Sequence, residues 1–105
     1  MNRVAITGSG TINSLGHSVK ETLANMAEGL CGIRPLFFRD VDRLDIKIGG
    51  QVKDFDPTTV FNRQQLALYD RVTQFTLIAA KEAIKQSGII FSGELAAKSG
   101  VVLGT

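Results

Sequence analysis

The stretch from Asp70 to Gly88 is the feature that most constrains what this chain can fold into. Its apolar side chains recur at the spacing of an α-helix and share one face, which holds Val72, Phe75, Ala79 and Ala83 with Ile78 beside them. Gly88 stands where a glycine in the left-handed conformation commonly ends a helix. The pattern predicts a helix from Asp70 to Ser87, and the small side chains of Ala80 and Ala83 predict that it lies close against a sheet.

Three short segments outside this helix are typical of β-strands. Residues 4–6 form an apolar run that ends in a glycine turn, and residues 98–105 begin a similar run. In residues 46–52 apolar and polar side chains alternate as in a half-exposed strand, and two glycines indicate a bulge or a close backbone approach. Residues 33–45 include a proline and show neither the helical nor the strand period of apolar residues, so they are predicted to be a connection. Strands interleaved with helices predict an α/β fold with a largely parallel sheet.

Two further helices are predicted from their first residues. Ser18 and Glu21 have the spacing of a capping box, which predicts a helix over residues 18–29 that ends at a glycine. Residues 62–65 have a sequence that can cap a short helix. Both assignments depend on side chains that satisfy the free amides of a first helical turn.

The composition is that of a globular protein, with 44% hydrophobic and 21% charged residues. A chain of 105 residues can bury only a thin core. The formal charge is +2, from 12 basic and 10 acidic residues without a block of one sign, so nothing predicts nucleic-acid binding. The apolar run near Met1 is too short for a signal peptide, and no stretch is long enough for a membrane helix. We therefore expect a soluble, cytoplasmic protein.

Cys31 and His17 are the side chains that first suggest catalysis. They are the only cysteine and the only histidine, which excludes an internal disulfide and a metal site made of such ligands. Cys31 follows the end of the first predicted helix, whereas activated thiols favour a helix N-terminus, so we expect a small packed thiol with a structural role. His17 precedes the capping serine and is expected to be solvated or hydrogen-bonded locally. No catalytic residue, cofactor or metal is predicted in this chain.

Two other motifs suggest anion binding at first sight. The glycine-flanked residues 8–10 follow a predicted strand, as in phosphate-binding loops, but Asn13 replaces the third glycine of the dinucleotide motif. These glycines are instead expected to allow a tight turn. Asp70 and Arg71 could form an acid or an anion clamp, but such a pair at a helix start is more often a cap and a structural ion pair.

Six blocks follow one another along the whole chain. They are Val4-Ala5-Ile6-Thr7-Gly8-Ser9-Gly10, Gly29-Leu30-Cys31-Gly32-Ile33, Gly50-Gln51-Val52-Lys53-Asp54-Phe55-Asp56-Pro57, Asp70-Arg71-Val72-Thr73-Gln74-Phe75, Ala79-Ala80-Lys81-Glu82-Ala83 with Ser87-Gly88, and Gly100-Val101-Val102-Leu103-Gly104-Thr105. Their order and spacing resemble those of the β-ketoacyl-acyl-carrier-protein synthase family. The similarity is greatest to its elongating synthase II group, which acts on carrier-protein thioesters.

The resemblance implies a thiolase-like α/β fold, of which residues 1–105 supply the first part of the N-terminal domain and end within or just after the third strand. It implies an acyltransferase that condenses an acyl thioester with malonyl-acyl-carrier protein in fatty acid elongation, as a homodimer and without a cofactor. In this family a cysteine takes the acyl chain and two histidines promote decarboxylation, and all three lie beyond Thr105. The segment alone is therefore expected to be inactive.

Arg63 is the one residue to which the resemblance gives a binding role. In such synthases the matching short helix, here residues 61–69, presents basic side chains to the acidic acyl carrier protein. Arg63 remains, whereas Gln64, Ala67 and Leu68 occupy the other positions. Docking through Arg63 and residues further along the protein, recognition of an unusual carrier, and a simple solvated charge all stay open. Two alternatives for the function also stay open: a non-catalytic subunit that sets product length, and a self-contained α/β binding module.

Overall fold

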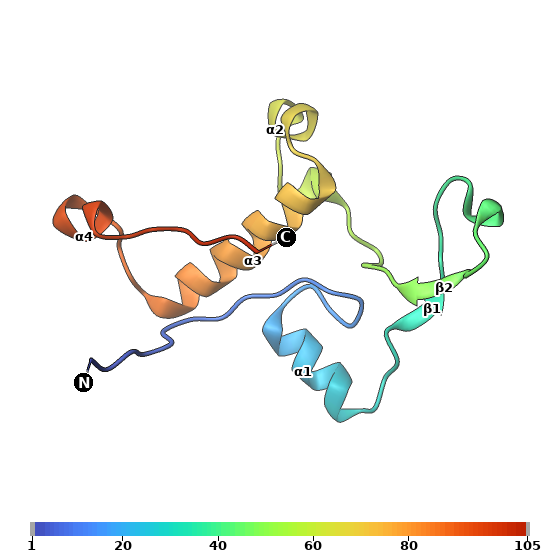
Figure 1. Ribbon diagram of the computed structural model, residues 1–105, viewed down its shortest axis with the longest axis horizontal. Helices are drawn as coiled ribbons and strands as arrows, with labels where there is room; N and C mark the ends of the chain where they lie inside the picture. Colours follow the sequence, from blue (N-terminus) through green and yellow to red (C-terminus); the bar gives the residue numbers. More distant parts are fainter. Residues whose placement is uncertain (1, 105) are drawn as a thin grey trace.

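Helix α3 (Arg71–Ser87) is the longest element of the computed structural model, which describes residues 2–104. The elements before α3 are α1 (Val19–Ala27), β1 (Ile33–Pro35), the 3-10 turn η1 (Val41–Arg43), β2 (Ile48–Gly50), the 3-10 turn η2 (Pro57–Thr59) and α2 (Arg63–Leu68), and α4 (Gly93–Ala97) follows it. Figure 1 shows these elements spread around α3 instead of closing over one core. The Cα radius of gyration is 17.0 Å, against about 13 Å for a compact chain of this length.

The described residues leave most of their apolar surface exposed. Phe61, with 4% of its surface exposed, is the one apolar side chain among them that is buried. Val4 and Val102 are 95% and 99% exposed. Because apolar surface is stabilised by removal from water, these residues need packing partners that the described part of the chain does not supply.

The helix starts agree with the sequence. Asp70 caps α3 by accepting a hydrogen bond from the Thr73 amide at 2.8 Å, and Gly88, with φ 65°, ends it in the left-handed conformation. The predicted helix over residues 70–87 is therefore confirmed. The short helix α2 begins with a complete capping box, in which Asn62 and Gln65 each accept a hydrogen bond from the other's backbone amide.

Helix α1 is confirmed with a change in its cap. The Ser18 hydroxyl accepts a hydrogen bond from the Glu21 amide at 3.1 Å, as the spacing predicts. The Glu21 carboxylate accepts from the His17 amide at 2.8 Å and not from Ser18, so the reciprocal bond is made one residue earlier. Gly29 follows α1 with φ 71°, a conformation that suits glycine.

The sheet of the described residues is one antiparallel pair, with Ile33 opposite Gly50 and Pro35 opposite Ile48. The predicted strand over residues 46–52 is confirmed for its centre. The prediction of a connection is wrong for residues 33–35, which form β1, because a proline is tolerated in a short edge strand. The Gln51 side chain extends the pairing by bonding both the amide and the carbonyl of Phe37, at 2.9 Å and 2.8 Å.

The predicted parallel strands over residues 4–6 and 98–105 are not formed in residues 2–104, and Thr105 itself lies outside the described residues. Neither segment pairs with a neighbouring strand, and Ile6 is 92% exposed. A strand needs a partner for its backbone N–H and C=O groups, and the described elements offer none to these segments. The largely parallel sheet predicted from the sequence is therefore absent from this part of the chain.

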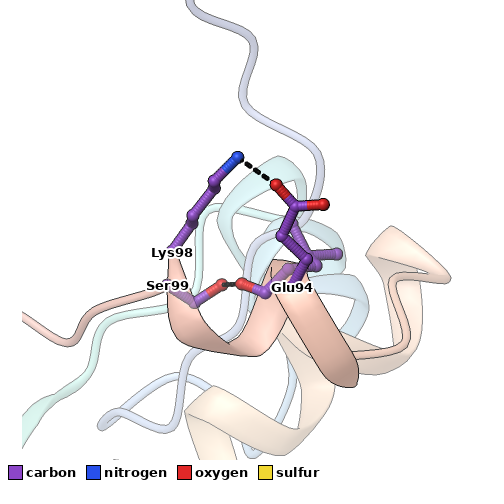
Figure 2. Close-up of polar contacts among 4 residues, drawn as sticks. Glu94, Lys98 and Ser99 are labelled. Carbon is purple, nitrogen blue, oxygen red and sulfur yellow. Dashed lines mark hydrogen bonds and ion pairs between the residues drawn. The ribbon is translucent and has the colours of Figure 1, made fainter.

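Helix α4 is stabilised by contacts between its residues and the two residues that follow it (Figure 2). The Lys98 ammonium group pairs with the Glu94 carboxylate four residues earlier, and the Ser99 hydroxyl donates to the Leu95 carbonyl at 2.6 Å. Such an exposed pair adds little stability, because water screens both charges. The helix is held by local bonds rather than by packing on α3.

Candidate functional site

The glycine-flanked loop at residues 8–10 lies against α3. A Cβ atom on Gly8 would overlap the Ala83 carbonyl oxygen, and one on Gly10 would overlap the Ala79 carbonyl oxygen. Neither glycine is among those with positive φ. The expectation that they allow a tight turn is therefore wrong: they allow the loop backbone to approach the helix backbone, along the small-residue face that the sequence places against a neighbour.

Two side chains of α3 bind the amides of this loop and of α1. One Glu82 carboxylate oxygen accepts from the Thr11 amide at 3.0 Å, and the other accepts from the Val19 amide at the start of α1 at 2.9 Å. Gln86, one turn further, accepts from the Ser9 amide at 2.7 Å. The Ser9 and Thr11 amides thus bind side chains of α3 and are not available to a phosphate.

His17 is held in place at both its ring and its backbone. Its Nε2 atom donates to the Lys53 carbonyl oxygen at 2.6 Å, and its ring meets the Phe55 ring edge-on at 6.1 Å between centroids. The partner lies 36 positions along the chain, so the expectation of a local bond is wrong. The sequence could not indicate this bond, because every residue has the same backbone carbonyl group.

Cys31 is exposed in the link between α1 and β1, so the expected packed thiol is wrong. Its Sγ atom lies 3.6 Å from the Ile33 carbonyl oxygen, a weak local contact. The hollow beside His17, of about 180 Å³, is lined by Asn13, Ser14, Leu15, Gly16, His17, Glu21, Arg34, Lys53 and Asp54, without Cys31. The thiol and the imidazole are therefore not brought into one site.

Asp70 and Arg71 separate instead of forming an ion pair. Asp70 caps α3, and hydrogen bonds from the Thr73 side chain and backbone hold the pKa of its carboxyl below the ordinary 3.8. The Arg71 guanidinium lies over the Phe75 ring at 5.0 Å and the Phe55 ring at 5.8 Å. The predicted cap is confirmed and the predicted ion pair is wrong, because the aromatic faces attract the guanidinium.

Arg71 also lines a hollow of about 810 Å³ between the start of α3 and the β1–β2 hairpin. The other lining residues are Pro35, Phe37, Phe38, Gln51, Val52, Lys53, Asp54, Phe55 and Asp56. Three phenylalanines and five polar or charged side chains line it, and it contains no cysteine, serine or histidine. Among residues 2–104, no three His, Cys, Asp or Glu side chains are grouped as metal ligands, and no helix is long and apolar enough to span a membrane.

The Arg63 side chain on α2 is exposed to solvent. Arg63, Gln64, Ala67 and Leu68 are exposed, whereas Gln65 and Leu66 are half-buried. The helix is anchored by the buried Phe61, whose ring meets that of Tyr69 edge-on at 5.9 Å. Figure 1 shows α2 standing out from the N-terminal end of α3.

The comparisons with known proteins identify the class to which this scaffold belongs. The family model described as "Beta-ketoacyl synthase, N-terminal domain" matches residues 1–105. The chain therefore belongs to the beta-ketoacyl synthase family, and its fold class is the thiolase-like α/β class of that domain. The resemblance of the six blocks is confirmed.

Individual relatives agree with the family. The chain is 32% identical over 103 residues to a "3-oxoacyl-[acyl-carrier-protein] synthase 2" of Synechocystis sp.. Proteins of the same name from Staphylococcus aureus and Coxiella burnetii are each 30% identical over 103 residues. Each alignment covers 98% of this chain and 25% of the relative, so the chain spans about a quarter of the length of the relatives it matches.

Proposed function

We propose that residues 1–105 are the first part of the N-terminal thiolase-like domain of a longer 3-oxoacyl-[acyl-carrier-protein] synthase. The observation that carries this proposal is the family match over the whole chain, supported by relatives whose names state that activity. The complete protein joins an acyl thioester to malonyl-acyl-carrier protein and releases carbon dioxide, in fatty acid elongation.

The chemistry takes place outside this segment. A thiolate attacks the acyl thioester carbonyl, forms an enzyme thioester and releases the carrier thiol. Decarboxylation of the malonyl thioester gives a carbanion, which attacks the enzyme thioester and returns the thiolate. The family resemblance assigns these steps to a cysteine and two histidines beyond Thr105. We assign structural roles to Cys31 and His17, because Cys31 does not line the hollow beside His17 and the His17 ring is bound to the Lys53 carbonyl.

The segment contributes a scaffold that the rest of the protein completes. Residues 4–6 and 101–103 are extended and apolar, and Val4 and Val102 are almost fully exposed. The remaining three quarters of a relative-sized chain supply the neighbouring strands that these segments lack. Burial of this surface gives the complete protein its parallel sheet.

We extend the proposal to partners and location. The substrates arrive on an acyl carrier protein, and Arg63 on the exposed face of α2 contributes an ionic contact to it. The complete protein is a homodimer in the cytoplasm, whose reducing conditions suit a chain with one cysteine. Sedimentation of the complete protein at several concentrations tests the dimer.

A second candidate is a non-catalytic partner subunit of an active synthase. The feature that favours it is the outward face of α2, where Arg63 is the only charged side chain. Such a subunit keeps the fold of the family and forms no acyl-enzyme. It increases the activity of a second, catalytic chain when the two are mixed.

One experiment separates these functions. The complete protein and its Cys31→Ser variant are incubated with acyl- and malonyl-acyl-carrier protein, and release of carbon dioxide with formation of the 3-oxoacyl product is followed. We expect condensation by both proteins at similar rates. Condensation that is lost in Cys31→Ser contradicts the structural role of Cys31, and the absence of any condensation by the unmodified protein contradicts the synthase.

A further inference from the structure

Two side chains of α3 accept hydrogen bonds from backbone amides near the start of the chain. The Glu82 carboxylate accepts from the Thr11 and Val19 amides, which lie 71 and 63 positions earlier. The Gln86 side chain accepts from the Ser9 amide, 77 positions earlier. These bonds join the N-terminal loop and the start of α1 to α3, and no β-strand takes part in them.

The Val19 amide shows that α1 depends on α3 for part of its own cap. Val19 is the first residue of α1, and the amides of a first helical turn have no acceptor within their own helix. The Ser18 hydroxyl caps α1 through the Glu21 amide. Glu82 supplies the acceptor for the Val19 amide from a different helix, at 2.9 Å. Contact with α3 therefore completes the N-terminal cap of α1.

Two asparagines hold the turn between the loop and α1. The Asn13 side chain donates to the Thr22 hydroxyl at 3.0 Å and accepts from the Leu15 amide at 2.8 Å. The Asn25 side chain donates to the Leu15 carbonyl oxygen. Residues 8–27 and α3 therefore form one bonded unit, which we call the α1–α3 unit.

The segments predicted as parallel strands lie outside this unit. Residues 4–6 directly precede the loop, and residues 101–103 follow α4. Among residues 2–104 neither segment pairs with a strand. The bonds of the α1–α3 unit are thus made in a chain that has no parallel sheet, which shows that they do not need one.

We propose that the α1–α3 unit forms before the parallel sheet when the complete protein folds, and that Glu82 is the residue that joins its parts. Helices α1 and α3 begin at local caps, and helices form faster than sheets. All parts of the unit lie between residues 8 and 87, whereas three quarters of a relative-sized chain, with the missing neighbour strands, lie further along. Strand pairing therefore closes longer loops and follows later.

Hydrogen exchange during refolding of the complete protein tests this order. The protein is diluted from urea, exposed to a short exchange pulse after different refolding times, digested and analysed by mass spectrometry. We expect peptides from residues 8–22 and 71–87 to become protected in one phase, at least about tenfold faster than peptides from residues 98–104. Protection of residues 98–104 before or together with residues 8–22 overturns the proposed order.

A pair of variants tests the part played by Glu82. Glu82→Gln keeps the shape of the side chain and one acceptor oxygen, and Lys85→Gln makes the same change from charge to amide at an exposed position of α3. We expect Glu82→Gln to slow the early phase about fivefold and Lys85→Gln to leave it unchanged, because only Glu82 binds the loop and α1. Equal rates in the two variants overturn the role of Glu82, and the wild-type experiment tests the order of folding without either variant.

Discussion

Substitution of Gly10 by alanine is expected to detach the N-terminal loop from α3. The new Cβ atom would overlap the Ala79 carbonyl oxygen and lie 2.8 Å from the Ala79 carbonyl carbon and 3.0 Å from the Ala83 amide nitrogen. All three are backbone atoms of a regular helix, so the loop has to move. The movement strains the contact and lengthens the bond from the Thr11 amide to Glu82. Overpacking and the loss of one charge-assisted hydrogen bond together cost about 2–4 kcal/mol.

Thermal unfolding of the complete protein measures this cost. A loss of about 2 kcal/mol lowers the melting temperature by about 4–8 °C in a domain of ordinary size. Ser9→Ala in the same loop is the matched control: it keeps the Ser9 amide bond to Gln86, loses only the 3.2 Å hydroxyl contact, and is expected to cost less than about 1 kcal/mol. If Gly10→Ala melts at the same temperature as Ser9→Ala, the close approach of loop and helix is refuted.

Substitutions at three further positions test other contacts by unfolding of the complete protein. Glu82→Ala leaves the Thr11 amide without its acceptor and is expected to cost about 2 kcal/mol, whereas Glu82→Gln, which keeps one acceptor oxygen, costs less. Phe61→Ala removes the buried anchor of α2 and is expected to cost about 3 kcal/mol; an unchanged melting temperature contradicts that anchor. Asp70→Ala is expected to destabilise at pH 7, with a difference from wild type that shrinks as the pH falls below 3.8, because the folded state lowers the Asp70 pKa; a difference independent of pH rejects the cap.

The helices could be predicted from the sequence because their determinants are local. The Asp70 and Asn62 caps bond amides three residues ahead, and Gly88 ends α3 through its own backbone conformation. Each signal lies within one turn of the helix end that it fixes. The small residues of α3 also indicated a close neighbour, although the neighbour is the loop at residues 8–10 instead of a sheet.

The longer-range contacts could not be predicted from the sequence. The bond from His17 to the Lys53 carbonyl and the two bonds of Glu82 join segments that are 36 to 71 positions apart. A backbone group has the same chemistry at every residue, so no pattern identifies which one a side chain will bind. The predicted strand over residues 4–6 is not formed in the described chain for a related reason. A segment of high β propensity forms a strand only when it pairs with another strand.

Arg63 is exposed in the described chain, and its role in carrier binding stays a prediction. The sequence gives the loss of basic side chains at positions 64, 67 and 68. The exposure of Leu68 and the stacking of Arg71 on two phenylalanine rings are features of the folded chain.

Peptide mapping of the acyl-enzyme tests the central claim most directly. The complete protein is incubated with acyl-carrier protein, digested and analysed by mass spectrometry for the residue that carries the acyl group. We predict an acyl group on a cysteine beyond Thr105 and an unmodified Cys31. An acyl group on Cys31, or a protein that forms no acyl-enzyme at all, would contradict the assignment of residues 1–105 as the scaffold of a condensing synthase.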